Sequence, residues 1–133
     1  MLLSNLLKSE NKNYKKISVR GISFDSRKVK KGDIFFAIKG NKKSGVNFIN
    51  DAISKGASVI VSSKKIKYAN SNAPLLLVKD VRKSLSEACS KFYKKKSPNI
   101  IAVTGTNGKS SVANFFYQIL NFNRISVASI GTL

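Results

Sequence analysis

The sequence predicts an α/β fold, in which a small domain with a mixed sheet is followed by one βαβ unit of a second domain. Two observations support this prediction. Apolar runs of strand length alternate along the chain with amphipathic stretches that have helical spacing. A polar, lysine-rich segment at 94–98 then precedes a further apolar run, a glycine-rich turn and another amphipathic stretch. We place the boundary at residue 97, which gives domains of 1–97 and 98–133.

The first domain is expected to contain four strands and three helices. The predicted strands are 17–24, 34–38, 58–61 and 75–78, which are short and rich in apolar residues. A short amphipathic helix is predicted at the N-terminus from the spacing of Leu2, Leu3, Leu6 and Leu7. A second helix is expected to run from Phe48 to near Gly56, and a third to begin at Asp80, which suits an N-cap.

Composition limits the function classes that are worth considering. The chain has 133 residues and a net charge of +19, from 25 basic and 6 acidic residues, and a charge this large favours anionic partners. Lysines greatly outnumber arginines and occur in short runs through every segment, whereas base readout depends mainly on arginine. We therefore favour a solvated, lysine-rich surface, and keep a nucleic-acid-binding module as an alternative.

Several other classes are disfavoured by residues that the sequence lacks. There is no histidine, which removes most zinc sites and every histidine-based catalytic triad. The single cysteine, Cys89, excludes an internal disulfide and is expected to be a buried thiol on a helix. No apolar run reaches the ~18 residues that a membrane span needs. The N-terminus also lacks the basic region and cleavage site of a signal peptide.

A phosphate-binding loop is the strongest motif in the chain. It follows an apolar run, 100–103, and precedes an amphipathic stretch that begins at Val112, so strand, loop and helix occur in the required order. The loop is shorter than the common form because its two glycines are only three residues apart. The candidate nucleotide-binding residues are Gly105, Thr106, Asn107, Gly108, Lys109, Ser110 and Ser111. A second apolar run, 125–130, is expected to be the strand that closes the βαβ unit.

Each residue type in this loop has a physical role. Glycines allow backbone N–H groups to approach phosphate oxygens, and the N-terminus of the following helix adds further donors. Lys109 is the candidate catalytic residue, because it would place an ammonium on the β and γ phosphates of a nucleoside triphosphate. Ser110 would offer its hydroxyl to Mg²⁺. The alternative is an ordinary strand-to-helix turn that happens to carry a lysine.

The chain resembles the N-terminal part of the Mur ligases, the ATP-dependent amide-forming enzymes of peptidoglycan synthesis. The resemblance is carried by Phe24–Arg27 with Val29–Gly40, by Gly45–Phe48 with Ala52–Ala57, by Val78–Arg82, and by Val103–Ser111 with Ile130–Leu133. The Asp-Ser-Arg and Gly-Thr-Asn-Gly-Lys motifs are most similar to the member that adds the third stem-peptide residue. That residue is meso-diaminopimelate or lysine, and the acceptor is UDP-N-acetylmuramoyl-L-alanyl-D-glutamate.

Two departures accompany this resemblance. The family usually has two threonines where this chain has Ser110 and Ser111, although a hydroxyl is retained at both positions. The neighbouring ligase that adds D-alanyl-D-alanine is an alternative, but it usually carries Asp-Thr-Arg in place of Asp25-Ser26-Arg27.

The resemblance implies roles for residues of the first domain. This domain would hold the UDP part of the substrate, with Phe24 and Ser26 contacting uridine. Asn41, Lys42 and Lys43 would lie in a loop beside the nucleotide. From the residues alone, Ser26 and Arg27 are a polar turn after a strand, and the two lysines are a solvated loop.

The resemblance also implies a reaction through an acyl phosphate, with ATP and Mg²⁺, in a cytoplasmic and monomeric enzyme that contacts no membrane. The family's metal-binding glutamate and histidine, its carbamylated lysine and its amino-acid-binding C-terminal domain have no counterparts in this sequence. We therefore expect a truncated ligase, ending early in its ATPase domain, that does not turn over ATP alone. A small kinase or GTPase is a further alternative, but it needs a later acidic residue for Mg²⁺, and too few residues remain to supply one.

Overall fold

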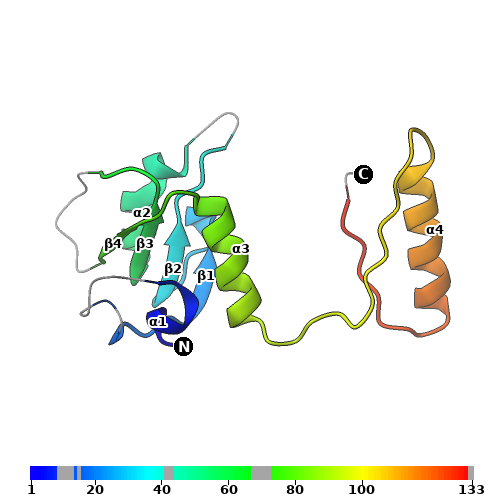
Figure 1. Ribbon diagram of the computed structural model, residues 1–133, viewed down its shortest axis with the longest axis horizontal. Helices are drawn as coiled ribbons and strands as arrows, with labels where there is room; N and C mark the ends of the chain where they lie inside the picture. Colours follow the sequence, from blue (N-terminus) through cyan, green and yellow to red (C-terminus); the bar gives the residue numbers. More distant parts are fainter. Residues whose placement is uncertain (9–13, 15, 41–43, 67–72, 132–133) are drawn as a thin grey trace. The chain divides into compact units, whose positions relative to one another are not determined.

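The chain divides into two compact units, Met1–Lys95 and Lys96–Leu133 (Figure 1). In this computed structural model the described residues are 1–8, 14, 16–40, 44–66 and 73–131. None of the helices in the described part of the chain is long and apolar enough to cross a membrane.

The first unit is built on a sheet of four parallel strands in the order β1-β2-β3-β4. The strands are β1 (Gly21–Ser23), β2 (Asp33–Phe36), β3 (Val59–Ser62) and β4 (Leu75–Leu77). The connection from β1 to β2 contains the 3₁₀ turn η2 (Ser26–Lys28). The connection from β2 to β3 contains η3 (Gly45–Phe48) and helix α2 (Ile49–Ser54). Consecutive parallel strands require such crossovers, because the chain must return to the end of the sheet at which the first strand began.

Helices cover both faces of this sheet. Alternate residues of β2 point to opposite sides: Ile34 and Phe36 pack with α1 (Leu3–Leu6) and α3 (Val81–Phe92), whereas Phe35 packs with α2. All four residues of β2 are buried, which is typical of a central parallel strand with both faces covered. Figure 1 shows α3 crossing one face of the sheet and α2 behind the other.

The ends of the helices follow the sequence signals. The Asp80 carboxylate accepts a hydrogen bond from the Lys83 N–H at 3.0 Å, so the predicted N-cap of α3 is confirmed. Gly56 lies just beyond α2 with φ +91° and donates its N–H to the Ile53 carbonyl at 2.8 Å. This is the left-handed residue that commonly ends a helix, and it confirms the predicted terminus.

The α/β class is confirmed, but the prediction of a mixed sheet is wrong. All three strand pairings are parallel, and antiparallel pairing among the described residues is limited to two isolated bridges. The predicted strand 17–24 is also shorter, because its first half pairs with the N-terminal segment. The Leu3 N–H donates to Ile17, and the Val19 N–H donates to Met1.

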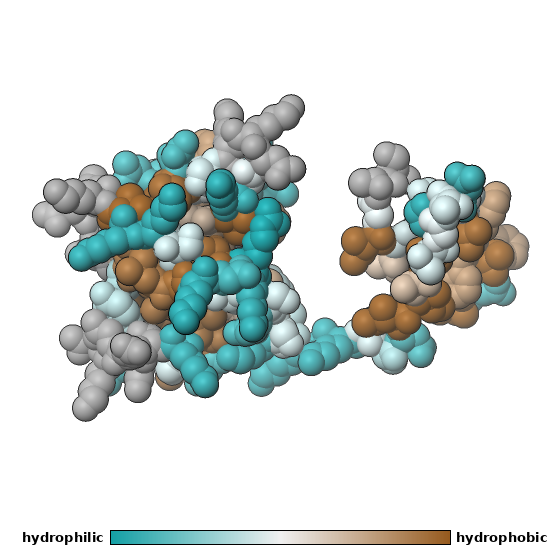
Figure 2. Space-filling view, turned by 45° about the horizontal axis from the view of Figure 1, so that its top comes forward, coloured by the Kyte–Doolittle hydropathy of each residue, from teal (hydrophilic) through white to brown (hydrophobic). Residues whose placement is uncertain are grey.

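The second unit contains helix α4 (Lys109–Phe122), as its amphipathic pattern predicts. The prediction of two flanking strands is wrong, because residues 100–103 and 125–130 have irregular backbone. A strand is stable only when its N–H and C=O groups pair with a neighbour, and neither run pairs in this way within the unit. Helix α4 buries none of its own residues, and Figure 2 shows apolar side chains over the surface of this unit.

Candidate functional site

A cavity of about 740 Å³ lies in the first unit, where the chain leaves β1 and β2. Ligands of open α/β sheets commonly bind at these carboxyl ends of parallel strands. The residues that line the cavity are Phe24, Asp25, Ser26, Arg27, Phe35, Ile38, Gly40, Gly45, Phe48, Arg82 and Leu85. They come from the turn after β1, from β2 and the segment after it, and from the first half of α3.

The turn after β1 is fixed by short-range hydrogen bonds. The Arg27 guanidinium donates two hydrogen bonds to the Asp25 carboxylate, at 2.9 Å from Nε and 2.8 Å from Nη2. The Arg27 N–H also donates to Asp25 Oδ1 at 3.0 Å. These bonds lower the pKa of Asp25 to about 2, so the carboxylate and the guanidinium are both charged at neutral pH.

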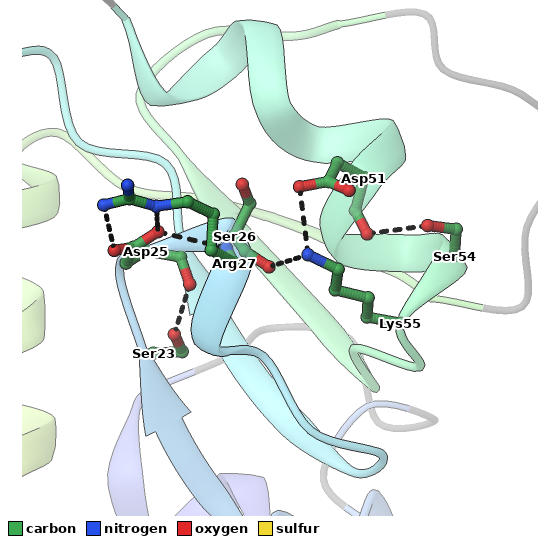
Figure 3. Close-up of polar contacts among 7 residues, drawn as sticks. All are labelled: Ser23, Asp25, Ser26, Arg27, Asp51, Ser54 and Lys55. Atoms are coloured by element: carbon green, nitrogen blue, oxygen red, sulfur yellow. Dashed lines mark hydrogen bonds and ion pairs between the residues drawn. The ribbon is translucent and has the colours of Figure 1, made fainter.

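A second set of contacts joins this turn to helix α2 (Figure 3). The Lys55 ammonium donates to the Ser26 carbonyl at 3.1 Å and lies 3.5 Å from Asp51 Oδ2. The pKa of Asp51 is lowered, mainly by hydrogen bonding from the Ser26 side chain and to a smaller extent by the charge of Lys55. Ser26 is only 6% exposed. The turn is therefore joined to Lys55 by a direct hydrogen bond to its backbone, and the buried side chain of Ser26 favours the charged form of Asp51.

The predicted uridine-side residues are only partly brought together. Phe24 and Ser26 both line the cavity, and Phe24 keeps 64% of its surface exposed. An exposed aromatic face of this kind is a platform on which a nucleobase can stack. Asn41, Lys42 and Lys43 lie outside the described residues, so the structure gives no account of them.

Two arginines complete the cavity, and sequence reasoning did not select them as site residues. Arg27 reaches it from the turn after β1, and Arg82 from the first turn of α3, where it donates to the Lys39 carbonyl at 3.2 Å. Guanidinium groups suit phosphate and carboxylate oxygens because their N–H groups form a planar fork. The sequence does contain one clue to their role, which is that arginine is rare in it. Only four of the 25 basic residues are arginines, and two of these four line the cavity.

The phosphate loop of the second unit is exposed and has unusual backbone angles. Gly105 has φ +149° and Gly108 has φ +75°, and α4 begins directly after Gly108 with no side-chain cap. A Cβ added at Gly108 would meet no atom within 4 Å, so the space in front of the helix is open. The first N–H groups of a helix have no partners inside it, and here they are available to an anion.

Lys109 lies over this loop. Its ammonium donates to the Gly105 carbonyl at 2.5 Å and to the Thr106 carbonyl at 3.0 Å. The structure therefore brings three of the predicted loop residues into direct contact. Asn107, Ser110 and Ser111 are exposed beside them.

The chemistry of the two sites differs. The cavity combines an aromatic face, two guanidiniums and apolar walls, which suits a ligand with a ring and anionic groups. The loop offers N–H groups and one ammonium, which suits phosphate. Among the described residues no group of three or more His, Cys, Asp or Glu side chains is placed to hold a metal ion. A cation at the loop would therefore depend on ligands such as a hydroxyl and the phosphates themselves.

Comparisons with known proteins give a family match over most of the first unit. Residues 18–93 match the model of the family described as "Mur ligase family, catalytic domain". The chain is 46% identical over 116 residues to the UDP-N-acetylmuramoyl-L-alanyl-D-glutamate--2,6-diaminopimelate ligase of Rickettsia conorii, covering 87% of the chain and 24% of that protein. It is 44% identical over 116 residues to the protein of the same name from Rhizobium meliloti, with the same coverage. The chain spans about a quarter of the length of these relatives.

Solved structures give the same result for the fold. The chain is similar to the MurF ligase from Thermotoga maritima in complex with ADP, with a TM-score of 0.62 and 27% identity, covering 78% of this chain and 24% of that one. It is also similar to a UDP-N-acetylmuramoyl-L-alanyl-D-glutamate--2,6-diaminopimelate ligase, with a TM-score of 0.67 and 25% identity, covering 93% of this chain and 26% of that one.

Proposed function

Because the chain belongs to the Mur ligase family, we propose that it is the N-terminal part of the ligase that adds diaminopimelate to UDP-N-acetylmuramoyl-L-alanyl-D-glutamate. The choice of diaminopimelate rests on the names of these two relatives. The ligase that adds D-alanyl-D-alanine is less favoured, because the relatives that are 44–46% identical carry the name of the diaminopimelate-adding ligase. We place the reaction in the cytoplasm, the compartment that supplies ATP.

The cavity is proposed to hold the UDP part of the substrate, and its lining is the observation that carries this proposal. Phe24 offers a face for the uracil ring, and Arg27 and Arg82 offer guanidiniums for the diphosphate. Asp25 limits the rotation of Arg27 through the two-point contact. The 1–97 segment is thus proposed as the UDP-substrate domain, and 98–133 as the beginning of the ATP-binding domain.

The loop is proposed to hold the phosphates of ATP. Gly105 and Gly108 keep side chains out of the space where phosphate would lie. The Lys109 ammonium, which now donates to two loop carbonyls, would donate to phosphate oxygens instead when ATP binds. Ser110, in the first turn of α4, supplies a hydroxyl that fits Mg²⁺ bound together with phosphates. When bound, Mg²⁺ would neutralise phosphate charge during transfer.

The proposed reaction proceeds in two steps. The D-glutamyl carboxylate attacks the γ-phosphorus of ATP, which forms an acyl phosphate and releases ADP. The amine of diaminopimelate then attacks the acyl carbon and displaces inorganic phosphate, which forms the amide bond. In this chain the loop N–H groups and Lys109 hold phosphate oxygens in position, which is the main requirement of phosphoryl transfer.

Calorimetric titration of the purified 133-residue chain with UDP tests the proposal. We expect saturable 1:1 binding, weakened about tenfold by Arg27→Gln or Arg82→Gln, since each removes one charged donor. Arg124→Gln, in the second unit, removes the same charge and is expected to leave the affinity unchanged. Absence of saturable UDP binding, or tighter and steeply salt-dependent binding of random DNA, would reject the proposal in favour of a nucleic-acid-binding module.

A further inference from the structure

We infer that Asp51 of α2 and Lys55, the residue that directly follows α2, form a positioning clamp, which holds the turn Asp25–Arg27 in the orientation that the cavity requires. Neither residue lines the cavity, whereas all three residues of the turn do. The pair would therefore act on a ligand only through the turn. The part of this inference that concerns UDP rests on the proposed function; the part that concerns the turn does not.

The turn needs outside support because it is very short. Its 3₁₀ segment, η2, has three residues, and such a segment cannot satisfy all its terminal carbonyls internally. The Lys28 N–H donates to the Asp25 carbonyl, which leaves the Ser26 carbonyl to a partner outside the turn. That partner is the Lys55 ammonium, 29 residues further along the chain.

The bonds inside the turn cannot fix its place in the unit. The Asp25–Arg27 pair joins residues two positions apart, and the Arg27 side chain is 83% exposed, so the pair orders Arg27 relative to Asp25 alone. The Lys55 contact instead connects the turn to a helix that packs on the sheet. Figure 3 shows the Lys55 ammonium between the Ser26 carbonyl and Asp51.

Asp51 has a complementary part in this arrangement. It lies one helical turn before Lys55, at the i, i+4 spacing that favours an ion pair, and it keeps the ammonium beside Ser26. Hydrogen bonding from the Ser26 side chain also reaches Asp51. Ser26 is thus held at its carbonyl by Lys55, while its buried side chain stabilises the charged form of Asp51.

Amide hydrogen exchange in the unliganded full chain tests the clamp directly. The reporters are the N–H groups of Arg27 and Lys28, which are bonded within the turn. We expect Lys55→Met to speed their exchange about tenfold, since one charged hydrogen bond is lost, while amides of β2 and β3 stay protected. Lys55→Arg, which can donate to both partners, is expected to restore the wild-type rate.

The matched control is Lys65→Met, which removes the same charge from another exposed position of the first unit. Equal exchange rates in Lys55→Met and Lys65→Met would overturn the inference. Faster exchange throughout β2 and β3 would also overturn it, because it would show a general loss of stability. Failure of Lys55→Arg to restore the rate would have the same consequence.

Binding of UDP supplies the second measurement. We expect Lys55→Met to raise the Kd for UDP about fivefold, a modest effect because both clamp side chains are partly exposed. An unchanged Kd in Lys55→Met, with normal wild-type binding, would refute the link from clamp to cavity. If the wild-type chain does not bind UDP, the proposed function fails, while hydrogen exchange still decides whether the clamp exists.

Discussion

Replacing Gly45 by alanine tests how closely the wall of the cavity is packed. An added Cβ would lie 2.7 Å from both the nitrogen and the oxygen of Ile38, and 2.9 Å from the Ala37 carbonyl carbon. These atoms belong to the backbone and cannot turn aside as a flexible side chain would. Ordinary contact begins near 3.4 Å, so the two segments must separate by about 0.7 Å.

The expected cost follows from this geometry. Overpacking against fixed atoms typically costs about 1–3 kcal/mol. The 2.8 Å hydrogen bond from the Gly45 N–H to the Ile38 carbonyl would also be stretched, at a cost of up to about 1 kcal/mol. For a unit of this size, each kcal/mol corresponds to a fall of roughly 4–8 °C in Tm. Together these costs are about 1–4 kcal/mol, so we expect Gly45→Ala to lower Tm by roughly 4–30 °C.

Thermal unfolding followed by circular dichroism measures this effect, and UDP calorimetry measures its consequence for the cavity. The control is Gly131→Ala, because a Cβ at Gly131 would meet nothing within 4 Å. A Tm for Gly45→Ala within about 2 °C of the control would refute the reasoning, since it corresponds to less than the smallest expected cost. Loss of UDP affinity without loss of Tm would show instead that the cavity wall adjusts locally.

Three further predictions concern charge, packing and ligand binding. The Arg27 hydrogen bonds hold the pKa of Asp25 at about 2, below its ordinary value of 3.8. The resulting stability should therefore be complete above pH 3.8 and lost as the pH falls toward 2. Unfolding curves of the wild type and Asp25→Asn should converge over that range, and a carboxyl that titrates near 3.8 by NMR would contradict this. Phe36→Ala should destabilise the chain by about 3–5 kcal/mol in denaturant titration, because Phe36 is fully buried. Phe24→Ala, at an exposed position, should instead weaken UDP binding with little change in stability, and a reversed pattern would refute both assignments.

The helices were predictable because their signals are local. A capping aspartate, a terminal glycine and a periodic apolar face all act within a few residues of the element that they define. Asp80 and Gly56 therefore mark the ends of α3 and α2 as expected. Strand pairing is different, because the same apolar run can pair in either direction or remain unpaired. The strand predicted over 17–24 was divided between a pairing with the N-terminus and the first strand of a parallel sheet.

The sequence by itself determined the α/β class, the glycine-lysine loop and the family, because these depend on residue types at fixed spacings. The tertiary structure alone decided which residues share the cavity. Arg27 and Arg82 are far apart in the sequence and line the same cavity only because β1 and β2 are adjacent and α3 packs against β2. Similarly, Lys55 reaches Ser26 only because α2 packs against the turn after β1. Contacts of this kind depend on the order of strands in the sheet, and no local pattern encodes that order.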